Sequence, residues 1–496
     1  MSRETTATKS LLTGMIDGVV STGIGSILFT IFGLLGFILS SRWLTKEELG
    51  TFVILQLVVG FVVGVSSLGL ELSVTKFIAE SEDAQRRQEI LNTVISFRLL
   101  TIFVSSGLAL LLRQPLFRLF GESPLVSMTI TYIPILVLFE SLTRMFDSVL
   151  SGYFQFRWMA FLSVITSFVN FILIIILLGW QDLGLPGRIW ARLIALIITV
   201  IAAVLWGGLK FHLRINFSQL WGMIKFSFPL FINYILSFVF MRADTFIIGG
   251  FLGVEEIAVY EIARKIPESI ESMYDSFRKV FFPYMSGLFA RQQNALAAQV
   301  LNHSLRLITF TGVLGTLVAF LFGKEIIILL FSGQYSESGF LFGLLMVVLT
   351  MNVIDYTLGY SLVAVGESNK PPLINTVHTA VNFLGYFTLI PLLGVVGAAL
   401  ATLLGIVVVN PINLFFLKRK QIAANAWTYG KPVLLGLGCF LLTSFMLADH
   451  WLVDLLVLLF YVALSFLMHT ITADDIVFAW EWIQHQIHRR KPGTQP

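Results

Sequence analysis

Long runs of apolar residues repeat along the whole chain, and they constrain its fold more than any other feature. Each run covers about 20 residues or more, enough for a helix to cross a hydrocarbon core of about 30 Å. Strands of a membrane barrel would instead alternate apolar and polar residues in short segments. The sequence therefore predicts an all-α integral membrane protein with about fourteen transmembrane helices. The expected spans are 14–41, 50–72, 91–112, 125–150, 158–180, 187–209, 226–251, 256–288, 300–322, 337–363, 371–392, 395–417, 431–448 and 451–471.

The composition agrees with this prediction. Of the 496 residues, 56% are hydrophobic and only 12% are charged, which lies outside the range of soluble globular domains. The single cysteine, Cys439, excludes a disulfide within the chain and any metal site built from cysteines. The net charge of +4 is interpreted as charge on membrane loops and not as a nucleic-acid surface.

The placement of lysine and arginine predicts the orientation of the helices. If the N-terminus is cytoplasmic, most of the 33 Lys and Arg residues fall in inner segments. Few fall in outer segments, and these include Arg188 and Arg192. Positive charge is enriched on the cytoplasmic side of membrane proteins. Both termini are therefore expected in the cytoplasm, with an even number of spans.

Short segments recur in order at an offset of about 208 to 212 residues. The pairs are LTKEELGTF at 44–52 with LGVEEIAVY at 252–260, GLPGRIWARL at 184–193 with GVVGAALATL at 394–403, and VNF at 169–171 with 381–383. The offset covers six predicted helices. Because six is even, both copies have the same direction in the membrane, as in transporters with parallel repeats.

The repeat predicts two parallel six-helix lobes followed by an extra helix pair. The expected N-terminal lobe covers residues 1–222 and the C-terminal lobe covers 223–430. The extra transmembrane pair covers 431–471, and residues 472–496 form a cytoplasmic tail. Such an architecture places a substrate path between the lobes.

Charged residues are concentrated in the stretch YEIARKIPESIESMYDSFRK, residues 260–279. On a helix these charges recur every three or four residues and share one face. A lipid-facing position would cost about 2.5–3.5 kcal/mol per charge, so the face must line water or pair with other buried groups. Pro267 is expected to kink this helix. At the repeat offset Arg264 corresponds to Gln56, so the C-terminal lobe is expected to supply the cations.

Other charges inside predicted spans allow two interpretations. Arg242 and Asp244 could bond locally or face a cavity. Glu140, Arg144 and Asp147 share one helix face, where mutual pairing competes with a ligand site. Arg98 and Arg306 occupy equivalent repeat positions and could brace the lobes, whereas Asp355, equivalent to Asp147, is expected to be structural. The acids Glu47, Glu48, Glu255 and Glu256 begin helices, where they offset the helix dipole and need no other role.

The chain shows no signature of an enzyme. The seven histidines have no ligand spacing, and there is no phosphate-binding loop, nucleophile motif or pair of catalytic carboxylates in a loop. No cofactor and no metal are expected.

Several of these segments resemble those of polysaccharide flippases of the multidrug and oligosaccharidyl-lipid exporter superfamily. SRWLTKEELGTF is similar to their R-x-L-x-x-x-E-x-G junction, and SSLGLELSVTKFIAE to their D-L-G-L…R-F-I-A-E segment. RADTFIIGGFLGVEEIAVYEIARKI resembles the segment that opens their second half, and GVVGAALAT their late G-x-x-G-A-A-x-A-T end. The resemblance covers most of residues 14–417. This chain has Leu68 where the family often has Asp, and Ala258 where it often has Gly.

The resemblance implies export of lipid-diphosphate-linked oligosaccharide repeat units across a bacterial inner membrane by alternating access, for surface polysaccharide biosynthesis. Arginine suits a diphosphate because its planar fork binds phosphate oxygens in pairs. The candidate substrate-binding residues are Arg264, Lys265, Arg242, Arg98, Arg144 and Arg306. The candidates for coupling to H⁺ or Na⁺ are Glu261, Glu268 and Asp244.

Two other functions compete with this interpretation. A cation-coupled multidrug exporter of the same fold would need a net acidic site, and the intramembrane cations disfavour it. A membrane polysaccharide polymerase or ligase would need a large external loop, and the predicted outer loops are short.

Overall fold

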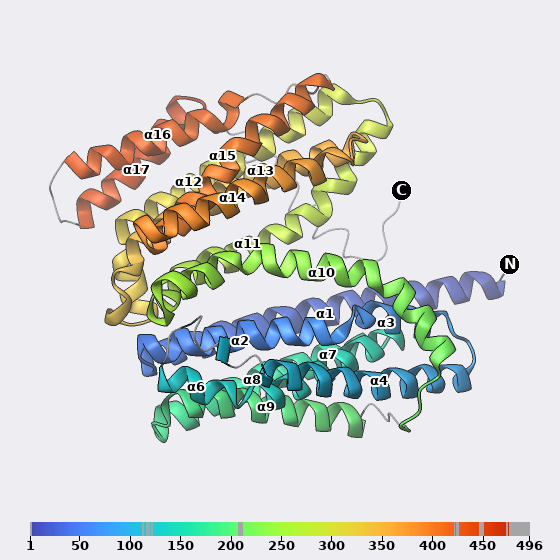
Figure 1. The fold of residues 1–496 in the computed structure, drawn as a ribbon. Helices are drawn as coiled ribbons and strands as arrows, with labels where there is room; N and C mark the ends of the chain where they lie inside the picture. Colours follow the sequence, from blue (N-terminus) through green and yellow to red (C-terminus); the bar gives the residue numbers. More distant parts are fainter. Residues whose placement is uncertain are drawn as a thin grey trace. The chain divides into compact units, whose positions relative to one another are not determined.

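A computed structural model describes residues 2–111, 114–115, 120, 123–206, 212–420, 422, 426–445, 451–472 and 475, and the side chains of all of these except 2–21, 206, 275–276 and 443–445. Every regular element in this part of the chain is a helix. The prediction of an all-α fold is therefore confirmed. Figure 1 shows that the helices of each half run side by side.

In the described residues the predicted spans fall on helices, and two of them, 50–72 and 125–150, are each divided between two helices. The first half contains α1 (Ser2–Trp43), α2 (Lys46–Ser67), α3 (Leu70–Glu80), α4 (Ala84–Leu111), α6 (Pro124–Ile130), α7 (Ile133–Gly152), α8 (Phe156–Ile174), the π-helical turn η1 (Ile175–Trp180) and α9 (Gly184–Trp206). The second half contains α10 (Phe217–Leu252), α11 (Val254–Ala290), α12 (Asn294–Leu330), the 3₁₀ turn η2 (Gly333–Tyr335), α13 (Ser338–Ala364), α14 (Lys370–Leu393) and α15 (Val395–Arg419). The final pair is α16 (Ala426–Phe445) and α17 (Trp451–Leu467).

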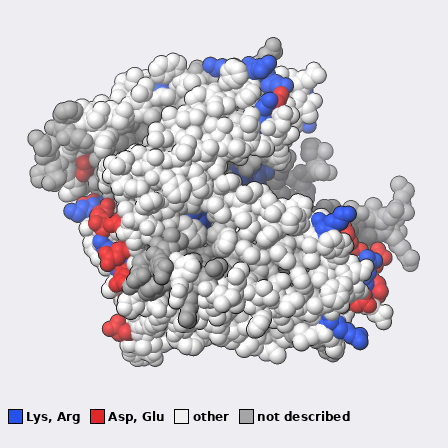
Figure 2. Space-filling view, viewed as in Figure 1, with Lys and Arg blue, Asp and Glu red and all other residues white. Residues whose placement is uncertain are grey.

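The chain is a multi-pass membrane protein. Ten of its described helices are long and apolar enough to cross a membrane, or eleven if the bent pair α6–α7 counts as one span. The shorter α16 and α17 are also apolar, and α11 is long but carries the charged stripe. A count of fourteen is compatible with these helices and stays a prediction. On the visible face, Figure 2 shows most charged side chains near the two margins toward which the helices run, with a wide, mostly uncharged surface between them.

In the first half, α1 is followed by the α2–α3 pair, then α4, the bent α6–α7 pair, α8 and α9. In the second half, α10 to α15 follow along the chain, and α16 and α17 come after them. The two parallel six-helix lobes expected from the repeat stay a prediction. One difference between the halves lies at the second predicted span. The span of α2 and α3 is broken after Ser67, whereas its counterpart α11 is one continuous helix that passes through Pro267. The kink expected at Pro267 stays a prediction.

By contacts the chain divides into an N-terminal unit, Met1–Ala258, and a C-terminal unit, Val259–Pro496. The lobe boundary at 222 and 223 was predicted from the repeat and stays a prediction. The helix α10 packs against the first half of the chain, because glycines of α2 allow the two helices to approach closely. A Cβ atom at Gly64 would overlap the ring of Tyr234 on α10, and the Tyr234 hydroxyl donates to the Gly60 carbonyl at 3.2 Å.

Each unit has its own apolar core. In the N-terminal unit, Val74, Ile95, Val149 and other buried residues join α3, α4 and α7. In the C-terminal unit, buried residues of α11, α12, α13 and α15, including Met285, Leu305 and Leu358, form a second core. These cores hold the helices that carry the charged residues described next.

Candidate functional site

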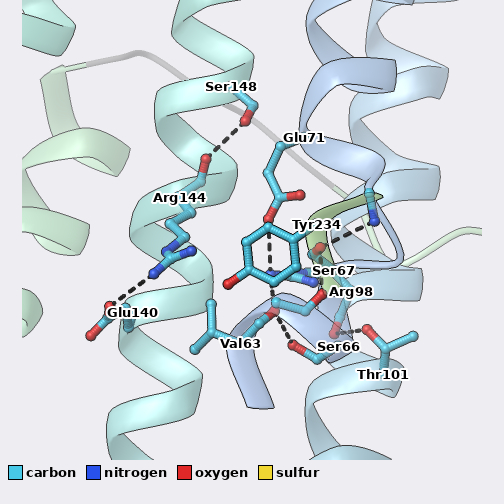
Figure 3. Close-up of polar contacts among 12 residues, drawn as sticks. Val63, Ser66, Ser67, Glu71, Arg98, Thr101, Glu140, Arg144, Ser148 and Tyr234 are labelled. Atoms are coloured by element: carbon cyan, nitrogen blue, oxygen red, sulfur yellow. Dashed lines mark hydrogen bonds and ion pairs between the residues drawn. The ribbon is translucent and has the colours of Figure 1, made fainter. Parts of the chain in front are cut away.

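The broken span of α2 and α3 places one buried arginine at its centre. Leu68 and Gly69 both have left-handed backbone, with φ of 49° and 72°, and this interrupts the helical hydrogen bonds. The Val63 carbonyl near the break accepts from the Ser66 hydroxyl at 2.9 Å and from Arg98 Nη2 at 3.3 Å. The same Nη2 lies 3.3 Å from Oε1 of Glu71, the second residue of α3 (Figure 3). Arg98 therefore joins the two sides of the break.

Arg98 is only 2% exposed, and its guanidinium is engaged within the N-terminal unit. This geometry favours a bracing role inside the unit, and the role of Arg98 as a substrate ligand stays a prediction. Isolated charges are costly within a membrane, which explains why the arginine has a carboxylate partner.

A second ion-pair cluster lies on α7 and α9. Glu140 Oε1 lies 3.3 Å from Arg144 Nη2, one turn along α7, and Glu140 Oε2 lies 3.3 Å from Arg192 Nη2 on α9. Figure 3 shows the Arg144 side chain between Glu140 and the region of Tyr234. One carboxylate thus faces two guanidinium groups, and the Asp147 carboxylate of the same helix also interacts with Arg144. The sequence allowed either mutual pairing or a ligand site for these residues. The structure shows the pairing of Glu140 with Arg144.

Arg188 and Arg192 were expected in an outer segment, and both lie in the N-terminal half of α9. Their side of the membrane stays a prediction. Arg188 is buried, donates from Nη1 to Asn170 Oδ1 at 3.2 Å, and its guanidinium carbon lies 4.1 Å from the centre of the Phe52 ring. The sequence did not indicate these contacts, although a spacing of four residues places both arginines on one face of a helix.

Cations occur in both halves of the chain. The C-terminal lobe was expected to supply the cations of the site, and apolar helices of the N-terminal half also hold Arg98, Arg144, Arg188 and Arg192. Arg98 and Arg144 were already among the candidate ligands. Which half supplies the cations that contact a substrate stays a prediction.

In the C-terminal unit, the charged stripe lies on α11. Arg264 Nε is 2.8 Å from Glu268 Oε1, one turn further along the helix. Arg264 and Lys265 are both partly exposed, whereas Glu261 is buried. The structure thus brings Arg264, Lys265, Glu261 and Glu268 together on two turns of one helix.

Two other candidates lie near the end of α10. Asp244 is buried, and its Oδ1 accepts from the Thr245 amide at 2.7 Å and from the Thr245 hydroxyl at 3.2 Å. Arg242 is partly exposed on the same helix. Of the two interpretations for Asp244, local bonding or a cavity-facing position, the structure shows local bonding.

Arg306 has a counter-ion that the sequence did not indicate. Its Nε lies 3.3 Å from Oδ1 of Asp475, a residue that follows α17, and His303 contacts the same carboxylate. Asp475 falls in the expected tail 472–496, most of which lies outside the described residues. The equivalent arginines Arg98 and Arg306 thus each form an ion pair within their own unit. Asp355 accepts from Asn413 Nδ2 at 2.7 Å, which fits a structural role.

Glu47 and Glu48, in the first turn of α2, do more than offset a helix dipole. Glu48 forms a capping box with Thr45 at the start of α2, and its Oε1 also accepts from the Leu185 amide at the start of α9, at 3.0 Å. Glu47 accepts a hydrogen bond from Ser123, the N-cap of α6. The expectation that these acids need no other role is wrong, because together they join three helix starts.

The described residues contain no cluster of three His, Cys, Asp or Glu side chains that could hold a metal ion. What they do contain is a set of guanidinium and ammonium groups inside long apolar helices. Such groups can attract an anionic headgroup, and arginine can bind phosphate oxygens through two parallel hydrogen bonds.

Comparison with known proteins places the chain in a family. Residues 38–339 match the sequence profile of the family described as polysaccharide biosynthesis protein. The probable low-salt glycan biosynthesis flippase Agl15 of Haloferax volcanii is 21% identical over 389 residues, which cover 77% of this chain and 79% of that protein.

Solved structures show the same fold. The lipid II flippase MurJ in an inward closed conformation superposes with a TM-score of 0.67 at 18% identity, covering 90% of this chain and 98% of MurJ. An inward-facing multidrug resistance MATE family transporter of the MOP superfamily has a TM-score of 0.62 at 16% identity, covering 82% and 98%. Because the family match spans more than half of the chain, this protein belongs to the family of polysaccharide biosynthesis proteins, and it has the fold of MOP-superfamily transporters.

Proposed function

We propose that this protein is a flippase that moves lipid-diphosphate-linked oligosaccharide repeat units across the inner membrane by alternating access. The observation that carries the proposal is the pair Arg264 and Lys265, partly exposed on a helix among apolar spans and inside the region that matches the polysaccharide biosynthesis family. The relative from Haloferax volcanii is described as a probable flippase for glycan biosynthesis, and this description supports the same assignment. The protein acts as a transporter and not as an enzyme.

The substrate site is proposed at the first turns of the charged stripe on α11. A lipid diphosphate carries about two negative charges, and a charge-assisted hydrogen bond to it contributes about 1.5–3 kcal/mol. Glu268 holds the Arg264 guanidinium at 2.8 Å, which orients the fork before the substrate arrives. The diphosphate would then take the place of this carboxylate, with Lys265 adding a second cation. Arg242, Arg144, Arg98 and Arg306 remain secondary candidates.

The proposed location is the bacterial inner membrane with both termini in the cytoplasm, as the distribution of lysine and arginine suggests. Lipid-linked oligosaccharides and membrane lipids are the proposed partners. Coupling to H⁺ or Na⁺ through Glu261, Glu268 or Asp244 is part of the same proposal. The fold of the MATE exporters is shared, but the arginines on α4, α7, α9 and α11 suit an anionic substrate better than a cationic drug.

The experiment replaces the proposed diphosphate ligands in cells that depend on the protein. Arg264→Ala and Lys265→Ala should each weaken substrate binding about ten- to a hundred-fold, so that unflipped lipid-linked oligosaccharide accumulates. Arg264→Lys should restore transport only in part, because an ammonium lacks the planar fork. The measurement is the amount of lipid-linked oligosaccharide in the cytoplasmic leaflet, together with the membrane level of each variant.

Arg291→Ala provides the matched control, because this arginine is exposed at the end of α11. It should transport at the normal rate. Normal transport by both Arg264→Ala and Lys265→Ala would remove the site assignment. Export of cationic drugs, with no effect on lipid-linked oligosaccharide when the gene is deleted, would contradict the flippase function itself.

A further inference from the structure

The inner half of the charged stripe carries aromatic residues that the proposed diphosphate site does not use. Tyr274 and Phe277 lie on α11, and Tyr356 and Tyr360 lie on α13 of the same unit. Arg278 lies beside them on α11. We call these five residues the aromatic platform. It lies toward the ends of α11 and α13 that the lysine and arginine distribution predicts to be cytoplasmic.

Three rings of the aromatic platform, those of Tyr274, Phe277 and Tyr356, contact one another through Tyr274. Tyr274 stacks on Tyr356 with ring centres 6.4 Å apart and contacts Phe277 at 5.3 Å. The hydroxyls of Tyr274 and Thr357 are hydrogen bonded at 2.6 Å. These contacts fix the ring planes, so the surface they present is preorganised.

Polar groups border these rings. Arg278 Nη1 donates to the Tyr360 hydroxyl at 2.7 Å, and its guanidinium carbon lies 5.3 Å from the centre of that ring. The Tyr356 hydroxyl interacts with the Glu271 carboxylate, which lies on the charged face of α11. The platform therefore combines apolar ring faces with a hydroxyl, a carboxylate and a guanidinium.

Core packing accounts for only part of the platform. Phe277 and Tyr360 pack against the buried core of the C-terminal unit, but Tyr356 is 38% exposed and Tyr274 is partly exposed. Tyrosine combines a large apolar ring face with a hydroxyl group that partners can hold in place, and it is enriched at recognition surfaces.

The chemistry of the platform fits a pyranose ring. Such a ring presents an apolar face of C–H groups and a rim of hydroxyls, so it needs a flat apolar partner with donors and acceptors around it. A few fixed polar groups beside apolar and aromatic side chains are the usual composition of a small-molecule site. We propose that the aromatic platform binds the sugar residues nearest the diphosphate of the lipid-linked substrate. The proposal rests on the proposed flippase function.

The position along α11 supports this assignment. Glu271 follows Arg264 by seven residues, which is two turns and about 10 Å along the same helix face. A diphosphate held at Arg264 and Lys265 would thus have its first sugars directed along α11 toward Tyr274 and Tyr356. The platform then supplies recognition of the glycan, and the cations supply recognition of the carrier.

The experiment separates these two kinds of recognition with two soluble probes. The first is inorganic pyrophosphate, and the second is the free oligosaccharide released by mild acid from the cell's own lipid-linked pool. Both are tested on the purified full-length protein in lipid nanodiscs by saturation-transfer-difference NMR for the oligosaccharide and by calorimetry for pyrophosphate. Tyr356→Leu should weaken oligosaccharide binding about five-fold, whereas Tyr356→Phe, which keeps the ring, should retain most of it.

Tyr284→Leu is the control, because Tyr284 is an exposed tyrosine on α11 outside the aromatic platform. It should leave binding of both probes unchanged, and Tyr356→Leu should leave pyrophosphate binding unchanged. Equal oligosaccharide binding by Tyr356→Leu and the unmodified protein would overturn the platform while the flippase function stands. Absence of binding of both probes to the unmodified protein would instead count against the proposed function.

Discussion

Leu68 is a residue whose backbone conformation conflicts with its chemistry. It ends α2 with φ of 49° and ψ of 26°, in the left-handed region that costs an L-residue with a Cβ atom about 1–2 kcal/mol. Asparagine and aspartate tolerate this region because their short side chains bond locally. The flippase family that this chain resembles often has Asp at this position. The break explains that preference, because it needs a residue that accepts positive φ.

Leu68→Asn should therefore stabilise the protein. The substitution relieves backbone strain without adding a charge, and a gain of about 0.5–1 kcal/mol is expected. Thermal unfolding of the purified protein in detergent, followed by intrinsic fluorescence, would measure the change in midpoint temperature. Gly69→Ala is the opposite test, since Gly69 has φ of 72° and its added Cβ would lie 2.8 Å from the Ser227 carbonyl oxygen. A lower midpoint for Leu68→Asn would show that the leucine side chain contributes more than the strain costs.

At the same scale, the sequence predicted which charges share a helix face but not how they pair between helices. Periodicity places Glu140 and Arg144 on one face, and the structure confirms their contact. Periodicity could not identify Arg192 as the partner of Glu140, or Asp475 as the partner of Arg306, because each partner lies on a distant part of the chain. An ion pair between distant segments depends on tertiary packing, which leaves no local pattern in the sequence.

The helices themselves were largely predictable. A continuous apolar run long enough to cross a bilayer has few alternatives to a helix, because every backbone group must be bonded internally. The break between α2 and α3 was not predicted, since Leu68 preserves the apolar run and Gly69 alone is a weak signal. The grouping of α10 with the N-terminal unit was also not predicted, because it depends on glycines that create space and not on an apolar pattern.

The contact of α2 with α10 gives a prediction for these two elements. Gly60 and Gly64 lie one turn apart on α2 and face Tyr234, and small residues at such spacing allow close helix approach in membranes. Gly64→Ala would push the Tyr234 ring away and break its hydrogen bond to Gly60, at a cost of about 1–3 kcal/mol. The loss should appear as a lower unfolding temperature in detergent.

Tyr234→Leu in the Gly64→Ala background tests whether the clash is the cause. If it is, the double variant should be destabilised by less than the sum of the two single variants, as expected for residues in contact. Gly222→Ala on α10 is the control, because an added Cβ there meets no atom within 4 Å. Additive effects of Gly64→Ala and Tyr234→Leu would show that the helices do not depend on this contact.

For the whole molecule, the repeat connects the fold to its proposed motion. The starts of α2 and α11 are equivalent positions of the predicted repeat, at LTKEELGTF and LGVEEIAVY. In this structure they touch, since a Cβ at Gly50 would overlap the Val254 carbonyl. Transporters with parallel repeats alternate access by rocking one copy against the other. The contact at Gly50 and Val254 is therefore expected to open during each cycle.

Cross-linking at this junction should stop transport. Lys46 is one turn from Gly50 on α2, and the exposed Glu255 follows Val254 on α11, so Lys46→Cys and Glu255→Cys place two thiols beside the contact. The only native cysteine, Cys439, is replaced by alanine in the same protein. A short thiol-specific cross-linker with an internal disulfide should block flipping in the double variant, because it holds the two helix starts together. Reduction of the cross-linker should restore flipping, because the helix starts can then separate. Each single-cysteine protein treated in the same way should remain active. Full transport by the cross-linked double variant would show that this end stays closed throughout the cycle, and the motion would have to take place elsewhere.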